Sequence, residues 1–337
     1  MNLPRSPLIA LVGVCLLVTT AHASEVNVYS ARKEALIRPL LDIFSERTGV
    51  DVNLLTGKSN ALIQRLKAEG RNSPADVLIT VDAGRLAFAS SLGLLQPLES
   101  DELETRVPAT LRSPDNLWFG LSKRARVVVY NPERVAQTEL GDYESLADPK
   151  WANRICVRSS VNIYNQSLLA SLIEHNGSEA ATAWARSVRD NMARSPQGND
   201  SAQIKAVAAG ECDVALVNTY YLGGMLSTPE LRETAEAVKV HFPNQSNRGA
   251  HVNISGAGVT KHAKNTAEAK MLLEYLVSEE AQAWYAQSNH EYPVVDGVQP
   301  SELVASFGDF QSDSLNVSVL GERNAEAVQA FDIAGWE

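Results

Sequence analysis

Two adjacent tyrosines, Tyr220 and Tyr221, follow an apolar run over residues 214–217 that predicts a buried strand. In open α/β sheets, the loop that leaves a parallel strand lies at the crevice where ligands bind. Phenol oxygens are hard ligands, and few ligands other than a hard, highly charged metal ion would require two of them. The pair is therefore a candidate metal site, and packing of two aromatic rings is the alternative.

A third phenol, Tyr164, stands at the start of a helix that the sequence predicts over residues 164–174. The first turn of a helix has unpaired N–H groups and a partial positive charge, so an anion bound there would find ready donors. The alternative is that Tyr164 packs in the interior while Asn162 caps the helix.

Other site chemistries have less support. Gly57-Lys58-Ser59 resembles the end of a phosphate-binding loop, but the earlier glycine of that motif is missing, so we interpret Ser59 as a helix N-cap. No Gly-x-Ser-x-Gly segment occurs and no spacing selects a Ser-His-Asp triad, so a secreted hydrolase is a low-ranking alternative. A zinc site is not favoured, because the sequence has no Cys-x-x-Cys pair and its later histidines stand singly, at His175, His241, His251, His262 and His290.

The first 23 residues have the pattern of a cleavable secretory signal peptide. Arg5 precedes an apolar stretch over residues 8–18, and Ala21-His22-Ala23 forms a small-residue cleavage site. Cys15 lies inside the apolar stretch, and a lipid-anchored N-terminus is the alternative interpretation. The remaining 314 residues have a formal net charge of −11, because the removed segment contains Arg5 and no acid. An acidic exported chain is a poor nucleic-acid binder.

Two cysteines, Cys156 and Cys212, remain after removal of this segment. An oxidising compartment favours a disulfide between them. Two buried thiols on neighbouring strands are the alternative.

The elements around these residues alternate between strand and helix. The sequence first predicts strands over 26–29, 50–55 and 77–80, with helices over 33–47 and 59–69 between them. A second alternation predicts strands over 126–130, 155–157 and 214–217 and helices over 164–174, 178–192, 200–209 and 266–285. Helical periodicity between short β-branched runs indicates an α/β fold with a parallel sheet. The length favours two lobes, and the lack of a loose linker suggests that strands cross between them.

Seven segments in chain order resemble the periplasmic ferric-iron-binding proteins of bacterial ABC importers. They span nearly the whole exported chain: Val28-Tyr29-Ser30-Ala31-Arg32, Ser73-Pro74-Ala75-Asp76-Val77, Ser122-Lys123-Arg124-Ala125-Arg126-Val127, Ala147-Asp148-Pro149-Lys150-Trp151, Ile163-Tyr164-Asn165-Gln166-Ser167, Asn218-Thr219-Tyr220-Tyr221 and Glu291-Tyr292-Pro293-Val294. The Tyr-Tyr pair together with the Tyr-Asn-Gln helix start is the specific part of the resemblance.

The resemblance implies a two-lobed periplasmic-binding-protein fold with hinge strands near 120–130 and 240–255. The first α/β lobe would comprise residues 24–124 and 250–300. The second would comprise residues 125–249 and 301–337 and carry the tyrosine ligands.

The same resemblance implies that Tyr164, Tyr220 and Tyr221 coordinate Fe(III), with Tyr29 or an anion completing the shell from the first lobe. Some relatives place a His or a His-Tyr pair after the first strand, where this chain has Lys33-Glu34, so that ligand is missing here. Asp82 matches an acidic ligand of other relatives only loosely, and we leave it out of the ligand set.

A small anion such as carbonate would fill the remaining positions, bound by Arg124 or, as second choice, Arg32, because a guanidinium matches a planar oxyanion. The resemblance thus implies a periplasmic, monomeric binding protein that catalyses no reaction and delivers Fe(III) to a membrane permease. A binder of small oxyanions or phosphonates on the same scaffold, with Arg124, Ser159 and Ser160 at the ligand, is the alternative.

Overall fold

The computed structural model describes residues 24–337. The predicted signal peptide, with Cys15, lies outside the described residues. Over the range 24–337, no helix is both long enough and apolar enough to cross a membrane.

The N-terminal third alternates strand and helix as the sequence predicts. Its main elements are β1 (Glu25–Ser30), α1 (Arg38–Thr48), β2 (Asp51–Thr56), α2 (Ser59–Glu69), β3 (Val77–Thr80), α3 (Ala83–Ser91) and α4 (Asp101–Arg106). The bounds of α2 and β3 agree with the prediction to the residue.

The rest of the chain begins with one long strand and ends in helices. Its elements are β4 (Phe119–Tyr130), β5 (Ile155–Cys156), α5 (Ile163–Asn176), α6 (Ser178–Asp190), α7 (Asp200–Ala208), β6 (Val214–Asn218), α8 (Thr219–Leu226), α9 (Pro229–Glu236), β7 (Lys239–His241), β8 (Val252–Val259), α10 (Thr266–Leu276), α11 (Glu279–Asn289), α12 (Glu302–Ala305), α13 (Val319–Glu322) and α14 (Asn324–Ala334).

The strands form one sheet in the order β2-β1-β3-β8-β4-β6-β5, with β7 also paired to β4. Pairing is parallel at the two ends, between β1 and β2, β1 and β3, and β5 and β6. It is antiparallel in the middle, where β8 pairs with β3 and β4, and β4 pairs with β6. The predicted α/β class is confirmed, but the sheet is mixed and not purely parallel.

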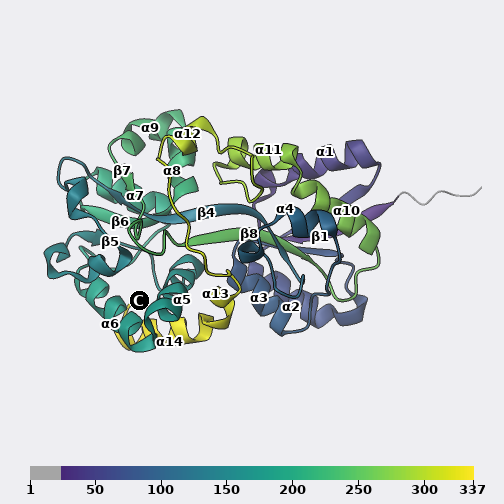
Figure 1. Cartoon of the computed structure of the whole chain (residues 1–337), viewed down its shortest axis with the longest axis horizontal. Coiled ribbons are helices and arrows are strands. Elements are labelled where there is room, and N and C mark those ends of the chain that lie inside the picture. Colours follow the sequence, from purple (N-terminus) through teal and green to yellow (C-terminus); the bar gives the residue numbers. More distant parts are fainter. Residues whose placement is uncertain (1–23) are drawn as a thin grey trace, which may run out of the picture.

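The two central strands, β4 and β8, run through the middle of the molecule between two groups of helices (Figure 1). α10 and α1 contact each other beside β1, whereas α5, α6 and α14 pack together in the other group (Figure 1), and α13 lies between α5 and α3. The chain therefore crosses the middle more than once, as the absence of a loose linker suggests.

Two predicted helices are interrupted. The helix predicted over 33–47 consists of a short 3₁₀ turn, Glu34–Leu36, followed by α1. Pro39 lies in the first turn of α1, and a helix continuing backward would bring its ring against the carbonyl of residue 35. The helix predicted over 266–285 is divided into α10 and α11, because Ser278 leaves the helical conformation and accepts a hydrogen bond from the backbone N–H of Ala281.

The predicted N-cap at Ser59 is wrong, and α6 also begins without a side-chain cap. Ser59 and Ser178 are the first helical residues of α2 and α6, and Lys58 and Gly177 occupy the cap positions. Neither cap residue accepts a side-chain hydrogen bond, so these two helices begin without the stabilisation that a serine cap gives.

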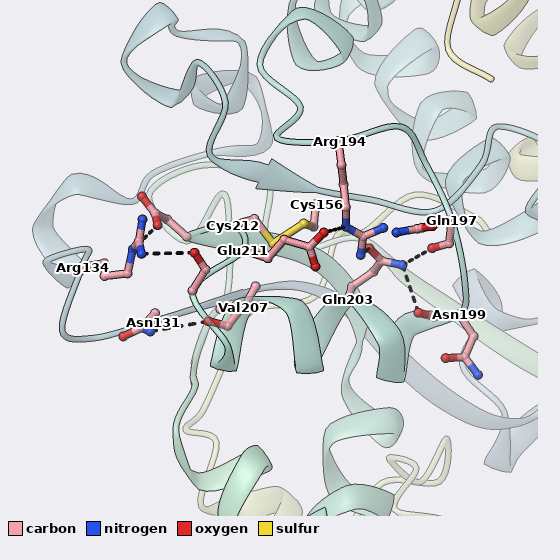
Figure 2. Close-up of a disulfide and its surroundings, with 12 residues drawn as sticks. Asn131, Arg134, Cys156, Arg194, Gln197, Asn199, Gln203, Val207, Glu211 and Cys212 are labelled. Atoms are coloured by element: carbon pink, nitrogen blue, oxygen red, sulfur yellow. Dashed lines mark hydrogen bonds and ion pairs between the residues drawn. A yellow bond between two sulfur atoms is a disulfide. The ribbon is translucent and has the colours of Figure 1, made fainter.

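The predicted disulfide between Cys156 and Cys212 is confirmed. Cys156 ends β5, and Cys212 lies two residues before the parallel neighbour strand β6 (Figure 2). Their Cα atoms are 5.8 Å apart, and both side chains are buried. The bond closes a loop with a sequence separation of 56 residues, which restricts the unfolded chain strongly.

We expect the double variant Cys156→Ser/Cys212→Ser to lose about 2 to 5 kcal/mol of unfolding free energy, because its unfolded state is no longer cross-linked. Urea denaturation followed by circular dichroism measures this loss. Dithiothreitol should lower the wild-type midpoint similarly and leave the double variant unchanged. Equal midpoints for wild type and variant would contradict the prediction.

Candidate functional site

The three tyrosines predicted as ligands lie at the starts of two helices. Tyr164 is the second residue of α5, and Tyr220 and Tyr221 are the second and third residues of α8. The pair was expected in a loop after β6, but the helix begins directly at Thr219. Asn162 caps α5 through a hydrogen bond from the Tyr164 backbone N–H, as one sequence alternative held.

The structure brings these three phenols together. The hydroxyl oxygens of Tyr164 and Tyr220 are 3.2 Å apart, although the residues are 56 positions apart in the chain. The rings of Tyr220 and Tyr221 lie beside each other, with centroids 4.4 Å apart. A cluster of three partly buried tyrosines is suited to a cation that can replace the phenol protons.

The phenols line a cavity of about 210 Å³ that is shared by segments from both ends of the sheet. Besides the tyrosines, its wall contains Ala31, Arg32, Lys33, Leu36, Val81, Arg124, Ser255, Asn289 and Glu291. The sequence singled out Arg32, Arg124 and the motif that contains Glu291. It gave no signal for Ser255 or Asn289, because their place depends on contacts between distant segments.

Tyr29, predicted as a first-lobe ligand, lies elsewhere. Its hydroxyl donates to the Glu69 carboxylate at 3.0 Å, and the Arg65 guanidinium lies over its ring. Tyr29 does not line the cavity. Successive side chains of a strand point to opposite faces, and in β1 Tyr29 points toward α2. This prediction is therefore wrong.

The two predicted anion-binding arginines are both buried at the cavity wall. Each donates to the hydroxyl of Ser255, Arg32 at 2.6 Å and Arg124 at 2.8 Å. Arg32 also pairs with Glu291 at 2.9 Å, whereas Arg124 donates to the carbonyls of Val81 and Ile254.

These contacts leave part of each guanidinium without a partner. Among residues 24–337, the Nε atoms of Arg32 and Arg124 have no hydrogen-bond acceptor. Two guanidinium groups face one carboxylate, Glu291, so this wall carries a net positive charge. A wall of this charge attracts anions.

Asp82, the acidic residue that we leave out of the ligand set, has structural contacts of its own. It caps α3 and accepts hydrogen bonds from Ser167 of α5 at 2.8 Å and Asn253 of β8 at 2.7 Å. Burial raises the pKa of its carboxyl group, against the effect of these donors and Arg124. Asp82 links α3, α5 and β8 but does not line the cavity.

A buried network fixes the two segments that carry the tyrosines. Asp200, at the start of α7, accepts from Arg126 at 2.8 Å, from Arg158 at 3.0 Å and from the backbone N–H of Asn218 at 2.7 Å. Arg126 also donates to the side chain of Asn165 at 2.7 Å. Asn165 directly follows Tyr164, and Asn218 precedes Tyr220 by two residues. The network thus determines how α5 and α8 begin.

Tyr164 and Tyr220 resist ionisation in the absence of a metal. Burial raises the pKa of Tyr164, although the nearby Arg124 charge acts in the opposite direction. Burial, together with the charges that Tyr164 and Tyr221 would carry, raises the pKa of Tyr220 well above its usual 10.0. Tyr164 and Tyr220 are therefore neutral near pH 7, and a cation that binds them must displace protons.

No cluster of three or more histidine, cysteine, aspartate or glutamate side chains suited to a metal ion occurs among residues 24–337. Among the described residues, we therefore consider the tyrosine cavity as the candidate metal site.

The model of the family described as bacterial extracellular solute-binding protein matches residues 72–306. The chain belongs to this family. The iron uptake protein A1 of Synechocystis is 51% identical to this solute-binding protein over 95% of this chain and 89% of its own.

Two solved structures are similar over nearly the whole chain. A Trichodesmium protein, IdiA or FutA, in complex with iron and citrate ligands has a TM-score of 0.90 and 52% identity, and covers 93% of this chain and 100% of its own. The ferric iron-binding protein A of Mannheimia haemolytica in an open conformation has a TM-score of 0.87 and 42% identity, with coverages of 93% and 99%. The predicted two-lobed periplasmic-binding-protein fold is thereby confirmed.

The metal-free protein should lose stability as pH rises above about 10, because the unfolded chain then releases phenol protons that folded Tyr164 and Tyr220 retain. Tyr220→Phe should reduce this loss. Urea midpoints at about pH 8 and about pH 11 measure it. Tyr130→Phe, outside the cavity, is the control. An equal decrease of the urea midpoint at high pH in wild type and Tyr220→Phe would contradict the prediction.

Proposed function

We propose that this solute-binding protein binds Fe(III) through Tyr164, Tyr220 and Tyr221 and delivers it to the membrane permease of an ABC importer. The observation that carries the proposal is the convergence of three phenols on one wall of one cavity, with two of their oxygens 3.2 Å apart. The iron-related names of relatives at 51% and 52% identity support the same ligand.

The chemistry of the three phenols suits a trivalent, hard cation. Fe(III) prefers anionic oxygen ligands, and a bound cation can deprotonate a group whose ordinary pKa lies far above neutral pH. Three phenolates neutralise the charge of Fe(III), so the loaded cavity keeps no net charge from the ion and these ligands. Burial, which opposes ionisation of Tyr164 and Tyr220 in the absence of a metal, then favours the neutral complex over partly charged ones.

The arginine wall would hold an anion that completes the coordination shell. Arg124 and Arg32 both line the cavity, and their charged guanidinium groups make both candidates for binding carbonate or another carboxylate-like anion. A structure of a relative contains citrate as well as iron, which supports an anion next to the metal. With Tyr29 outside the cavity, an anion or water is the source of the remaining oxygen ligands.

The lobe division remains part of the proposal. Residues 24–124 and 250–300 form the first lobe, and residues 125–249 and 301–337 form the second. The packing of α14 on α5 and α6 supports placing the C-terminal helix in the second lobe, whereas α13 contacts both α5 and α3 of the first lobe. All three tyrosines then belong to one lobe, and Arg32 and Glu291 belong to the other.

The proposed cellular setting follows from the same function. The protein would be exported through its N-terminal segment, act in the periplasm as a monomer and catalyse no reaction. A binder of small oxyanions or phosphonates is the second candidate, because Arg158 and Ser159 line an adjacent cavity of about 620 Å³. That ligand would not need three phenols, and its complex would be colourless.

Tyr220→Phe and Tyr221→Phe should each abolish or severely weaken Fe(III) binding, because each change removes one anionic oxygen and little else. Tyr164→Phe should act in the same direction, with an effect no larger. Titration of metal-stripped protein with Fe(III), with and without carbonate, followed by the red to orange iron–phenolate band, measures this. Tyr130→Phe controls for loss of a phenol elsewhere. Wild-type colour and affinity in both Tyr220→Phe and Tyr221→Phe would refute the iron site.

Fe(III) affinity should fall steeply as pH decreases, because each phenol binds the ion only after it loses a proton. Up to three protons should be released for each ion bound. Fe(II) should bind much more weakly, because its smaller charge gains less from three phenolates. Competition titrations at several pH values with ferric and ferrous iron test both points. Equal affinity for the two ions, or affinity independent of pH, would exclude ligation by three tyrosinates.

A further inference from the structure

Gly223 of α8 lies against His290 with no room for a side chain. A Cβ atom placed on Gly223 would be 2.6 Å from the Cβ of His290 and 2.9 Å from its Cγ. Carbon atoms that are not bonded to each other do not approach so closely. The next residue, Gly224, has nothing within 4 Å of the equivalent position. Two neighbouring glycines of one helix therefore differ sharply in their surroundings.

The Gly223–His290 contact joins the two walls of the tyrosine cavity. Gly223 follows Tyr221 by two residues in α8. His290 lies between Asn289 and Glu291, which both line the cavity, and Glu291 pairs with Arg32. One side of the contact thus carries two of the phenols, and the other side carries the arginine wall.

The elements behind the contact belong to opposite ends of the sheet. α8 packs against β6 and α9, whereas α11, which ends at Asn289, packs against α10, and α10 contacts β1. Figure 1 shows α8 among the helices at left and α11 among those at right. Apart from the central strands, this is therefore a place where the two lobes of the proposed clamp contact each other.

His290 is fixed by its backbone more than by polar contacts. It ends α11 in the left-handed conformation, with φ of 55°. Its Nδ1 atom is buried and has no hydrogen-bond partner among residues 24–337. The side chain therefore makes a steric contact, and its position follows from the end of α11.

We propose that Gly223 is a positioning residue for iron retention: its missing side chain lets His290 reach α8, and this contact determines how closely the arginine wall closes over the tyrosines. The inference rests on the proposed iron function. The open conformation of a relative at 42% identity supports a clamp that changes its opening. A larger residue at position 223 would hold the lobes apart while leaving all three phenols in place.

The test compares Gly223→Ala with Gly224→Ala as the matched control. Alanine is a better helix former than glycine at both positions, so a defect confined to position 223 cannot come from helix propensity. Gly224→Ala should keep wild-type behaviour. Gly223→Ala should still develop the iron–phenolate band but should lose Fe(III) to a competing chelator at least about tenfold faster. Small-angle X-ray scattering should show a larger radius of gyration for its iron-loaded form.

A second variant tests whether the effect passes through His290. His290→Gly removes the obstructing atoms, and glycine adopts a positive φ readily. The double variant Gly223→Ala/His290→Gly should therefore lose iron nearly as slowly as the wild type. If Gly223→Ala does not fold, the double variant should fold and retain iron.

Wild-type iron loss in Gly223→Ala would overturn the proposal, and so would failure of His290→Gly to rescue it. Absence of the iron band in the wild type would instead refute the proposed function. The contact would then be tested without metal, by urea midpoints. Gly223→Ala should be less stable than Gly224→Ala, and His290→Gly should remove that difference. Equal midpoints would overturn the steric contact itself.

Discussion

The buried ion pair between Arg126 and Asp200 is the interaction on which the tyrosine cavity depends. Both side chains are almost fully buried, and their groups also bond Arg158, Asn165 and the backbone of Asn218. Such a pair contributes little net stability compared with apolar packing, but removal of either partner leaves an uncompensated buried charge. Its value here is geometric. It joins β4, α7, β6 and the first turn of α5, and so brings Tyr164 next to a pair of tyrosines far along the chain.

The disulfide between Cys156 at the end of β5 and Cys212 before β6 reinforces this arrangement. Cys156 precedes Tyr164 by eight residues, and Cys212 precedes Tyr220 by eight residues. The disulfide thus joins the two segments that carry the phenols, and each half-cystine lies the same number of residues before Tyr164 or Tyr220. Burial keeps Tyr164 and Tyr220 protonated without a cation, so the phenols contact each other through one hydrogen bond between hydroxyl groups and through ring packing. The surrounding network and the disulfide therefore preorganise a ligand set that becomes favourable when the ion arrives.

Local features were predictable from the sequence. Periodicity gave β3 and α2 to the residue, and the Tyr-Tyr and Tyr-Asn-Gln motifs indicated the three phenols that the structure brings together. Features that depend on contacts between distant segments were not predictable. The antiparallel centre of the sheet, the place of Ser255 and Asn289 at the cavity and the contact of Gly223 with His290 leave no periodic pattern in the chain. The prediction for Tyr29 was wrong for a related reason. A motif match does not determine toward which face of a strand a side chain points.

Arg124 and Arg126 lie two residues apart on β4, and so on the same face of one strand that runs through the middle of the molecule. Arg124 bonds toward β8 and the segment after β3, whereas Arg126 bonds toward α5 and α7. The strand that joins the two halves thus passes directly behind the cavity. A rotation about that strand displaces atoms in proportion to their distance from it. The lever arm is longest at the outer rims, so a modest rotation would move the mouth of the cavity farther than the groups next to the strand.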